Sequence, residues 1–155
     1  MSTGSEAQMR IEVVDEERTR DLRRRVLRPN RPPDAPLPGD ELTDAVHFAA
    51  LDDDTVLGTC FVYPDPCPWW PDRPESWHLR QMATAEEQRG RGVGSAVLAA
   101  VVAYVRDRGG RLLWCNAREG AVGFYARHGL EPHGEIFIDE HHPVPHLRMW
   151  RDLDR

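Results

Sequence analysis

The sequence contains no lysine: all 20 residues counted as lysine or arginine are arginine. A Walker phosphate loop ends in lysine followed by serine or threonine, so that class of nucleotide site is excluded. No apolar run approaches the roughly 18 residues that cross a membrane. The N-terminal MSTGSEAQMR also lacks the basic start and apolar core of a secretory signal. We therefore expect no membrane partner.

Cysteine is scarce, and its pattern favours neither a disulfide framework nor a metal site. Cys60, Cys67 and Cys115 are odd in number and show no paired metal-ligand spacing. Disulfides persist mainly in oxidising compartments, so we expect a reduced, cytoplasmic setting. The net charge of −6 argues against a general nucleic-acid binder and mildly favours cationic ligands.

A chain of 155 residues is long enough for one domain with a real core. The hydrophobic content of 40% and the charged content of 30% are those of an ordinary soluble globular protein. We expect residues 1–9 to form a disordered tail and residues 10–155 to form the single domain, without internal repeats.

The first third of the chain predicts a strand, a helix and a proline-rich loop. Residues 10–14, RIEVV, form a β-branched run that favours a strand. Asp15 can cap a helix that starts at Glu16, and prolines from Pro29 onward end it. Residues 30–40 contain four prolines. They are interpreted either as an ordered loop or lid, or as a solvated linker.

Two apolar runs, residues 44–51 and 55–63, are joined by three aspartates and predict an antiparallel hairpin. A proline-rich loop follows, residues 64–76, and it contains Trp69 and Trp70. Exposed, these tryptophans would form a wall for a substrate or partner. Packed inward, they would plug the sheet. The sequence leaves both alternatives open.

The second half of the chain predicts a parallel crossover and an antiparallel end. Residues 77–84 favour a central strand, residues 92–108 a long amphipathic helix, and residues 111–117 a buried strand parallel to the first. A short helix is expected over residues 121–128. Residues 135–139 and 146–153 favour a closing antiparallel pair. This mixed order predicts an α+β domain with one mixed sheet.

Three alternating glycines stand where the central strand gives way to the long helix. Gly90, Gly92 and Gly94 lie beside Arg89 and Arg91. Such a turn leaves backbone N–H groups uncovered at a helix start, which carries roughly half a positive charge and attracts anions. The dinucleotide fingerprint G-x-G-x-x-G does not fit this spacing. The segment predicts a phosphate cradle of another type.

The R-x-x-G-x-G pattern from Arg89 to Gly94 resembles the pyrophosphate loop of the GNAT (Gcn5-related N-acetyltransferase) superfamily, whose signature is [QR]-x-x-G-x-[GA]. The preceding MAT and the later CNAREGAVGFYARHGLE, residues 115–131, also resemble family motifs. PVPHLRM, residues 143–149, resembles the ElaA-like branch. One departure is Glu86, where the family often has proline. The resemblance spans residues 10–153 and implies a mixed sheet of six to seven strands with about four helices, splayed between the fourth and fifth strands.

The resemblance also implies where acetyl-CoA would bind as co-substrate. The pantetheine arm would pair with the backbone of the central strand, through Met82 and Thr84, with a backbone N–H near Met82 facing the thioester oxygen. The backbone from Gly90 to Ser95 would hold the pyrophosphate. The implied cofactor-binding residues are Met82, Ala83, Thr84, Arg89, Gly90, Arg91, Gly92, Val93, Gly94, Ser95, Asn116 and Tyr125.

The resemblance further implies that Tyr125 protonates the leaving thiolate, the alternative being a core tyrosine. Asn116 would bond the cofactor arm, or it simply closes a strand. A general base must take the proton of the acceptor amine, and His78 is the candidate because its ordinary pKa is near 6.5. His146 and Glu75 compete with it, and each histidine also fits a buried structural role.

The resemblance thus implies an N-acetyltransferase that moves an acetyl group to a primary amine of a small molecule or peptide by direct attack in a ternary complex. The alternative is a non-catalytic acyl-CoA-binding or interaction module. Family members are often dimers, so a homodimer is among the expected assemblies. The acidic and histidine-rich segment 139–146 could suggest zinc, but its adjacent histidines and its prolines favour a solvated hairpin tip, and no metal is expected.

Overall fold

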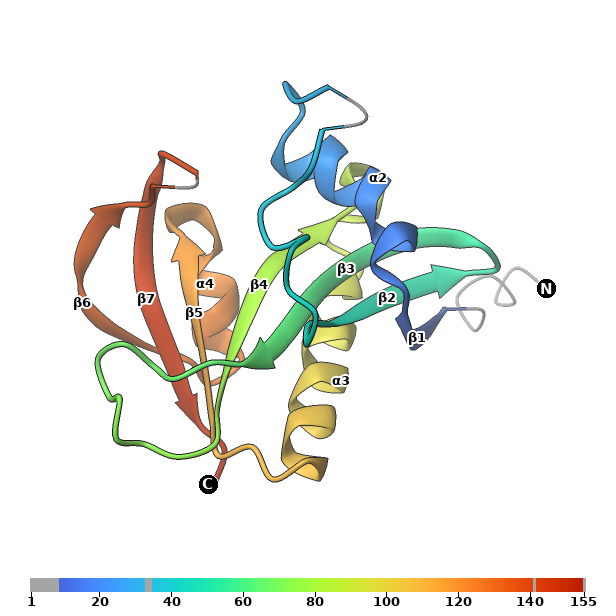
Figure 1. Cartoon of the computed structure of the whole chain (residues 1–155). Helices are drawn as coiled ribbons and strands as arrows, with labels where there is room; N and C mark the ends of the chain where they lie inside the picture. The colour runs from blue at the N-terminus through green and yellow to red at the C-terminus, as the bar shows by residue number, and fades with distance from the viewer. Residues whose placement is uncertain (1–8, 33–34, 141, 155) are drawn as a thin grey trace. The chain divides into compact units, whose positions relative to one another are not determined.

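The computed structural model describes residues 9–32, 35–140 and 142–154, so residues 1–8 of the expected tail 1–9 lie outside the described residues. Within these residues, seven strands form one mixed sheet in the order β1-β2-β3-β4-β5-β7-β6 (Figure 1). The strands are β1 (Arg10–Val14), β2 (Val46–Asp52), β3 (Thr55–Pro64), β4 (Ser76–Thr84), β5 (Leu112–Arg118), β6 (Glu131–Ile138) and β7 (Pro145–Asp152).

The described residues also contain three α-helices, against about four expected, and two short 3-10 helices. These are α2 (Glu16–Leu27), α3 (Val93–Asp107), α4 (Val122–Arg127), η1 (Glu86–Gln88) and η2 (Glu119–Ala121). None of the helices described is long and apolar enough to cross a membrane. The domain is α+β, as the element order predicted.

The chain divides into two compact units. Of the described residues, the first unit contains those up to Val62 together with Gln81–Val101, and the second contains Tyr63–Arg80 and those from Val102 onward. The elements β3, β4 and α3 each contribute residues to both units.

The first unit contains the antiparallel strands β1, β2 and the main part of β3. Val14 of β1 pairs with His47 of β2. Val46 of β2 pairs with Val62 of β3, which confirms the expected hairpin. Five consecutive residues of β2 are buried, so both faces of this strand are covered. Helix α2 starts after Asp15, whose side chain makes no capping hydrogen bond, and ends before the prolines as predicted.

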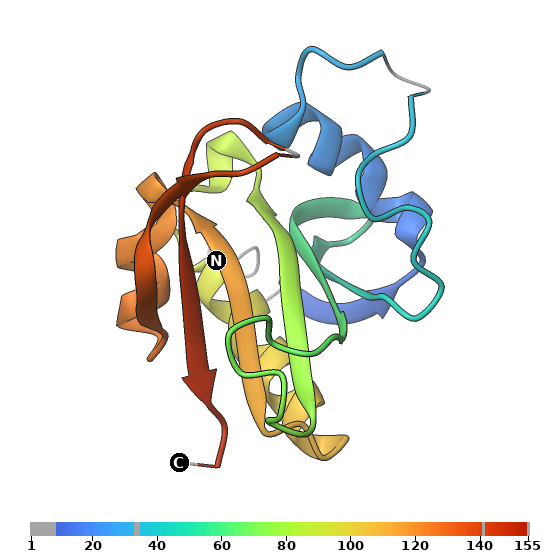
Figure 2. The same ribbon diagram turned by 60° about the vertical axis from the view of Figure 1, so that its left-hand side comes forward.

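The second unit contains the parallel pairing that the helix-to-strand pattern predicted. Residues Ser76, Trp77 and His78 of β4 pair with Leu112, Leu113 and Trp114 of β5. Within the second unit, in which β4 extends to Arg80, no pairing with β5 follows His78. The splay expected further along these strands would involve residues of both units and stays a prediction. β7 pairs antiparallel with β5 and with β6, and α4 packs against β5 and β6 (Figure 2).

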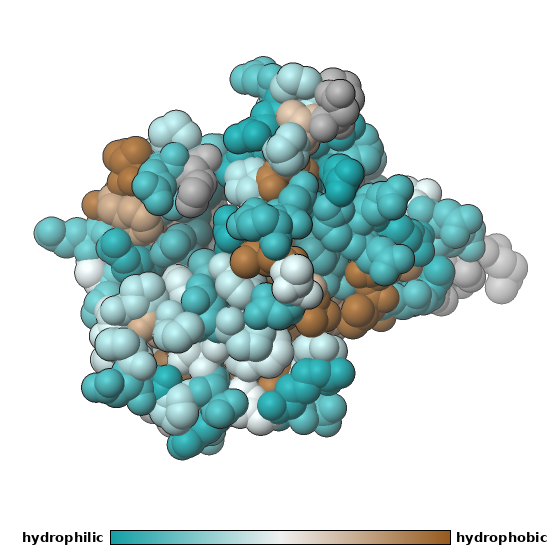
Figure 3. Space-filling model, in the orientation of Figure 1, coloured by the Kyte–Doolittle hydropathy of each residue, from teal (hydrophilic) through white to brown (hydrophobic). Residues whose placement is uncertain are grey.

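Strand β6 starts at Glu131, four residues before the expected start. Its register with β7 shifts between His133 and Phe137, and Gly134 lies in this irregular part with φ +76°. Beyond it, Ile136 and Ile138 are 55% and 64% exposed. Hydrophobic side chains gather on the surface around this end of β6 (Figure 3).

The proline-rich loop between β3 and β4 packs inward. Trp69 and Trp70 are partly buried against a core cluster that contains Cys67, Leu112 and Trp114. The loop, green in Figure 2, passes across β5. The interpretation of these tryptophans as a plug of the sheet is therefore the one the structure supports.

Candidate functional site

The glycine turn after β4 has the backbone that the phosphate-cradle interpretation requires. Gly90 and Gly92 have φ of +79° and +80°, in the left-handed region that side chains other than glycine rarely adopt. A Cβ built on either residue would meet no heavy atom within 4 Å. Space is therefore open above both glycines, and a ligand could approach the backbone closely.

Helix α3 begins directly after this turn. Its first hydrogen bond runs from Ala96 N–H to the Gly92 carbonyl at 3.0 Å. The N–H groups of a helix's first turn have no acceptor within the helix and carry partial positive charge. Val93 anchors the helix start: its side chain lies 2.6 Å from where a Cβ on Gly58 would stand, so only glycine fits at position 58. The turn therefore leads into a helix N-terminus, a kind of site suited to phosphate oxygens.

The predicted pantetheine strand is the end of β4 in the same unit. Ala83 is buried, whereas Met82 and Thr84 are half-buried. The Ala85 N–H donates to the Leu57 carbonyl at 2.9 Å, which ties the end of this strand to β3. Gln81, just before Met82, is one of three non-glycine residues with positive φ, at +54°, among the residues described.

These residues fall into two groups. The cradle, Arg89–Ser95, and the strand end, Met82–Thr84, belong to the first unit. Asn116, Tyr125 and His78 belong to the second unit. Each group is described by its own contacts.

In the second unit, Asn116 is half-buried on β5, opposite Arg148 of β7. Tyr125 is 6% exposed on α4, and its ring meets Phe124 edge-on at 5.2 Å. Its backbone carbonyl accepts hydrogen bonds from the N–H groups of His128 and Leu130, which close the helix. The phenol is therefore held on a short helix whose end is well defined.

His78 lies in a polar network of β3 and β4. Its Nδ1 is 3.1 Å from the Tyr63 hydroxyl and 3.2 Å from Asp65 Oδ2. The imidazole also stacks on Trp114, with ring centroids 3.7 Å apart. Burial lowers the pKa of His78, and the hydrogen bond to Asp65 opposes that shift. A neutral imidazole held by a carboxylate can accept a proton.

The two other candidates for the general base are His146 and Glu75, and the contacts of each are those of a residue with a structural role. His146 is buried, with Nδ1 2.6 Å from the Val144 carbonyl. Glu75 has φ +58°, its carbonyl accepts the Arg111 N–H, and its side chain is exposed.

The acidic and histidine-rich segment, residues 139–146, lies largely in the connection between the antiparallel strands β6 and β7. His142 N–H donates to Asp139 Oδ2 at 2.9 Å, and His141 lies outside the described residues. Among the residues that the structure describes, no group of three or more histidine, cysteine, aspartate or glutamate side chains is arranged to hold a metal ion.

Sequence reasoning missed the partners of His78 and a second network in the first unit. Asp65 and Tyr63 lie 13 and 15 positions before His78, with a proline-rich loop between, and no local pattern marks them. Arg23 of α2 bonds Asp40 and Gln81, 17 and 58 positions away. In the sequence, Arg23 begins a run of three consecutive arginines, and no local pattern marks it as buried.

Comparison with known proteins bears on the glycine turn and on the fold. The sequence model of the acetyltransferase (GNAT) family matches residues 12–130. The Bacillus subtilis protein YitI, described as an uncharacterized N-acetyltransferase, is 27% identical over 130 residues, which cover 83% of this chain and 87% of that protein.

Two solved structures share the fold. Escherichia coli ElaA aligns with a TM-score of 0.72 at 19% identity, over 93% of this chain and 99% of that one. An aminoglycoside 6'-N-acetyltransferase complexed with coenzyme A aligns with a TM-score of 0.71 at 16% identity, over 93% and 97%. At identities of 16% and 19%, these alignments show only that the fold is shared. Membership of the ElaA-like branch stays a prediction. With the family match over residues 12–130, the conclusion is that the chain belongs to the acetyltransferase (GNAT) family.

Proposed function

We propose that the protein is an N-acetyltransferase that takes the acetyl group of acetyl-CoA and transfers it to a primary amine in a ternary complex. The observation that carries this proposal is the open glycine turn at the start of α3. Gly90 and Gly92 adopt left-handed backbone, with nothing within 4 Å of their Cβ positions. This cradle fits a pyrophosphate, and the solved structure of a family relative with coenzyme A supports the same cofactor class.

The main chain of β4 would pair with the pantetheine arm through Met82 and Thr84. The Met82 N–H would then donate to the thioester oxygen, where negative charge develops as the amine attacks. A fixed donor at such an oxygen is typically worth a factor of about 100 to 1,000 in turnover. Asn116 of β5 would bond the amide part of the arm. No metal is needed for any of these contacts.

Tyr125 would act as the general acid. When the carbon–sulfur bond breaks, the thiolate needs a proton, and a phenol can deliver one across a single hydrogen bond. Tyr125 is 6% exposed, so few waters compete for this proton.

His78 would act as the general base, held by Asp65. If Nδ1–H donates to the Asp65 carboxylate at 3.2 Å, the lone pair is on Nε2 and can take the proton of the attacking amine. The proton leaves the amine nitrogen as its bond to the acetyl carbon forms, and the Tyr125 proton reaches sulfur. Charge and protons balance over the two steps.

The acceptor class is a primary amine of a small molecule or a peptide. The net charge of −6 favours cationic acceptors. The three cysteines are free and buried, which fits a reducing compartment such as the cytoplasm. A homodimer remains a prediction from the family resemblance.

The test is thiol release from acetyl-CoA with a panel of primary amines, read with a thiol reagent. The proposal predicts release that depends on both enzyme and amine. The alternative, a non-catalytic acyl-CoA-binding module, predicts calorimetric binding of acetyl-CoA without amine-dependent release. Absence of acetyl-CoA binding would contradict both.

A further inference from the structure

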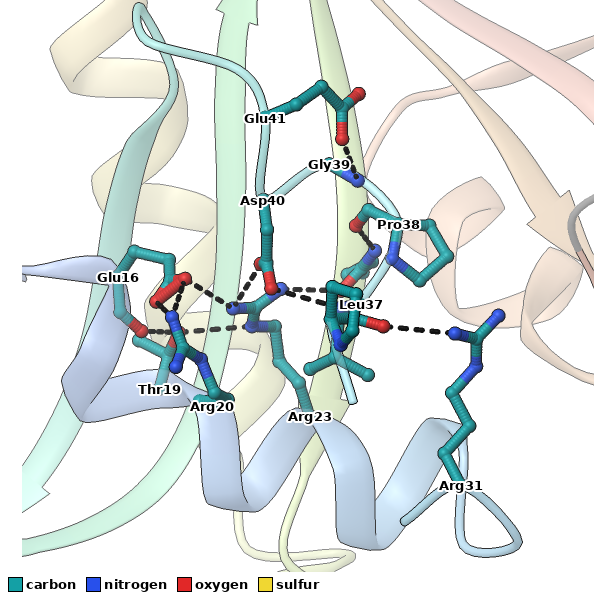
Figure 4. A network of polar contacts seen from close by, with 12 residues as sticks. Glu16, Thr19, Arg20, Arg23, Arg31, Leu37, Pro38, Gly39, Asp40 and Glu41 are labelled. Carbon is teal, nitrogen blue, oxygen red and sulfur yellow. Dashed lines mark hydrogen bonds and ion pairs between the residues drawn. The ribbon is translucent and has the colours of Figure 1, made fainter. Parts of the chain in front are cut away.

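A fully buried arginine lies in the first unit at the junction of α2, the loop before β2, and β4. The Arg23 side chain is 0% exposed. Its guanidinium donates to Thr19 Oγ1 at 3.0 Å and to Asp40 Oδ1 at 3.1 Å (Figure 4). It also donates to Gln81 Oε1 at 3.0 Å. A buried cation is tolerated only when its donors are satisfied, and each nitrogen here has a partner. The burial of Arg23 is therefore compensated by specific hydrogen bonds from all three guanidinium nitrogens.

Gln81 is fixed at both ends of its amide. Its Oε1 accepts from Arg23, and its Nε2 donates to the Pro38 carbonyl. The backbone of Gln81 is left-handed, with φ +54°, a conformation that non-glycine residues seldom adopt without support from their surroundings. The two side-chain bonds supply that support.

Residues 37–40, which include Pro38, are held by contacts of their own. Asp40 Oδ2 accepts the Leu37 N–H at 2.9 Å, while Oδ1 faces Arg23. Burial opposes ionisation of Asp40, but these two contacts outweigh it and lower the pKa of the carboxyl. Gly39 has φ +95°, and a Cβ there would meet the Phe61 ring at 2.5 Å, so the loop lies directly on β3.

The peptide plane after Gln81 carries the N–H of Met82. The backbone dihedrals of Gln81 set the direction of that N–H, and a return to extended conformation would turn it away from its present side of the strand. We propose that Arg23, acting through Gln81, is a positioning residue that aims the Met82 N–H at the thioester oxygen. This inference rests on the proposed function and goes beyond it, because it assigns a role to side chains that touch neither substrate.

A merely structural role for the network would change folding stability alone. A positioning role also changes how the protein distinguishes a thioester from an equally large group without a carbonyl. The probe pair is acetyl-CoA and S-ethyl-CoA, in which a methylene replaces the carbonyl. Both are measured by calorimetry on the full chain, so no acceptor amine is needed.

We expect the native protein to bind acetyl-CoA up to about 10-fold more tightly than S-ethyl-CoA, the contribution of one hydrogen bond. Gln81→Ala should bring the ratio close to 1 and leave the affinity for S-ethyl-CoA nearly unchanged. Gln81→Gly should keep part of the preference, because glycine adopts positive φ without side-chain support.

Arg23→Met should lower the ratio as Gln81→Ala does, with Arg25→Met as the matched control. Arg25 belongs to the same helix, and its side chain is 54% exposed, so its replacement should leave the ratio unchanged. If Arg23→Met does not fold, the affinity ratios of Gln81→Ala and Gln81→Gly test the inference by themselves.

Three results would overturn the inference. Equal affinity of the native protein for both nucleotides would show that no N–H meets the carbonyl. An unchanged ratio in Gln81→Ala would show that the network does not aim it, although the cofactor assignment would stand. Failure of the native protein to bind either nucleotide would overturn the proposed function and this inference together.

Discussion

The imidazole of His78 lies almost parallel to the indole of Trp114, with ring centroids 3.7 Å apart and 13° between the planes. The same indole donates its N–H to the Asp65 carbonyl at 2.9 Å, and the Asp65 carboxylate reaches His78 Nδ1. The Trp114 side chain thus contacts both His78, the proposed general base, and Asp65, the residue that orients it. The orientation of the imidazole is set before any substrate binds.

Asp65→Asn should shift the pH dependence of turnover. The Asp65 hydrogen bond opposes the lowering of the His78 pKa by burial, Arg80 adds to the lowering, and Asp139 opposes it. Without the Asp65 charge, the pKa of His78 falls further, so the acid limb of kcat should move to lower pH. The plateau should fall about 10-fold, part of the roughly 100-fold or more that a general base contributes.

The measurement is kcat against pH with one accepted amine, and Asp72→Asn in the same loop is the control because Asp72 is exposed. An acid limb that does not move in Asp65→Asn would remove His78 from the role of titrating base.

Gly92→Ala should abolish tight acetyl-CoA binding, whereas Gly134→Ala should not. The two glycines have nearly equal φ, +80° and +76°, and neither has a heavy atom within 4 Å of its Cβ position. Each substitution therefore carries a similar backbone strain of about 1–2 kcal/mol. Calorimetry separates strain from ligand contact. Equal affinity in the two variants would show that the glycine turn does not contact the cofactor.

Tyr125→Phe should lower kcat by about 100-fold, the smaller contribution expected of a general acid, and leave acetyl-CoA affinity nearly unchanged. Tyr104→Phe is the matched control, because Tyr104 lies on α3 and its ring packs on Trp77 of β4 and on Arg108. The comparison uses steady-state rates and calorimetry. Full turnover in Tyr125→Phe would exclude the phenol from the chemistry.

Folding stability should decline in mild acid because of His47. This histidine is 6% exposed, and its Nδ1 has no hydrogen-bond partner. Burial, with help from the Arg23 charge and against Asp40, lowers its pKa from 6.5 to about 4. Between these values the unfolded chain binds a proton that the folded chain does not, so stability falls as pH falls from about 6.5 to about 4.

His47→Leu should reduce this dependence, as followed by denaturant unfolding at several pH values in that window. The part that remains is assigned to His78, whose pKa burial also lowers. A slope equal to that of the native protein would contradict the assignment to His47.

The elements of this fold are predictable from sequence where local periodicity decides them. Alternation and turn residues located the β2–β3 hairpin, and the apolar spacing located α3 between Val93 and Asp107. We expected strand β6 to begin only at residue 135, because Pro132 and Gly134 are residues that usually break strands. The strand in fact begins at Glu131. Proline is accepted on an edge strand, and an irregular register absorbs the glycine.

The site was predictable only in its backbone part. The alternating glycines and the following helix are contiguous, so the turn at Gly90 and Gly92 followed from sequence. The side-chain networks did not. The helix pattern places Arg23 among the arginines of α2, and its burial depends on Asp40 and Gln81, which are distant in sequence. Pairings of this range are fixed by tertiary packing and leave no local pattern.

The most direct test of the account follows the acetyl group itself. The protein is incubated with acetyl-CoA labelled with carbon-13 in both acetyl carbons and with a mixture of primary amines, and products are resolved by mass spectrometry. If the protein is an N-acetyltransferase, we expect one labelled N-acetyl amine for each thiol released. Thiol release that yields only labelled acetate, or no release while acetyl-CoA is bound, would contradict it.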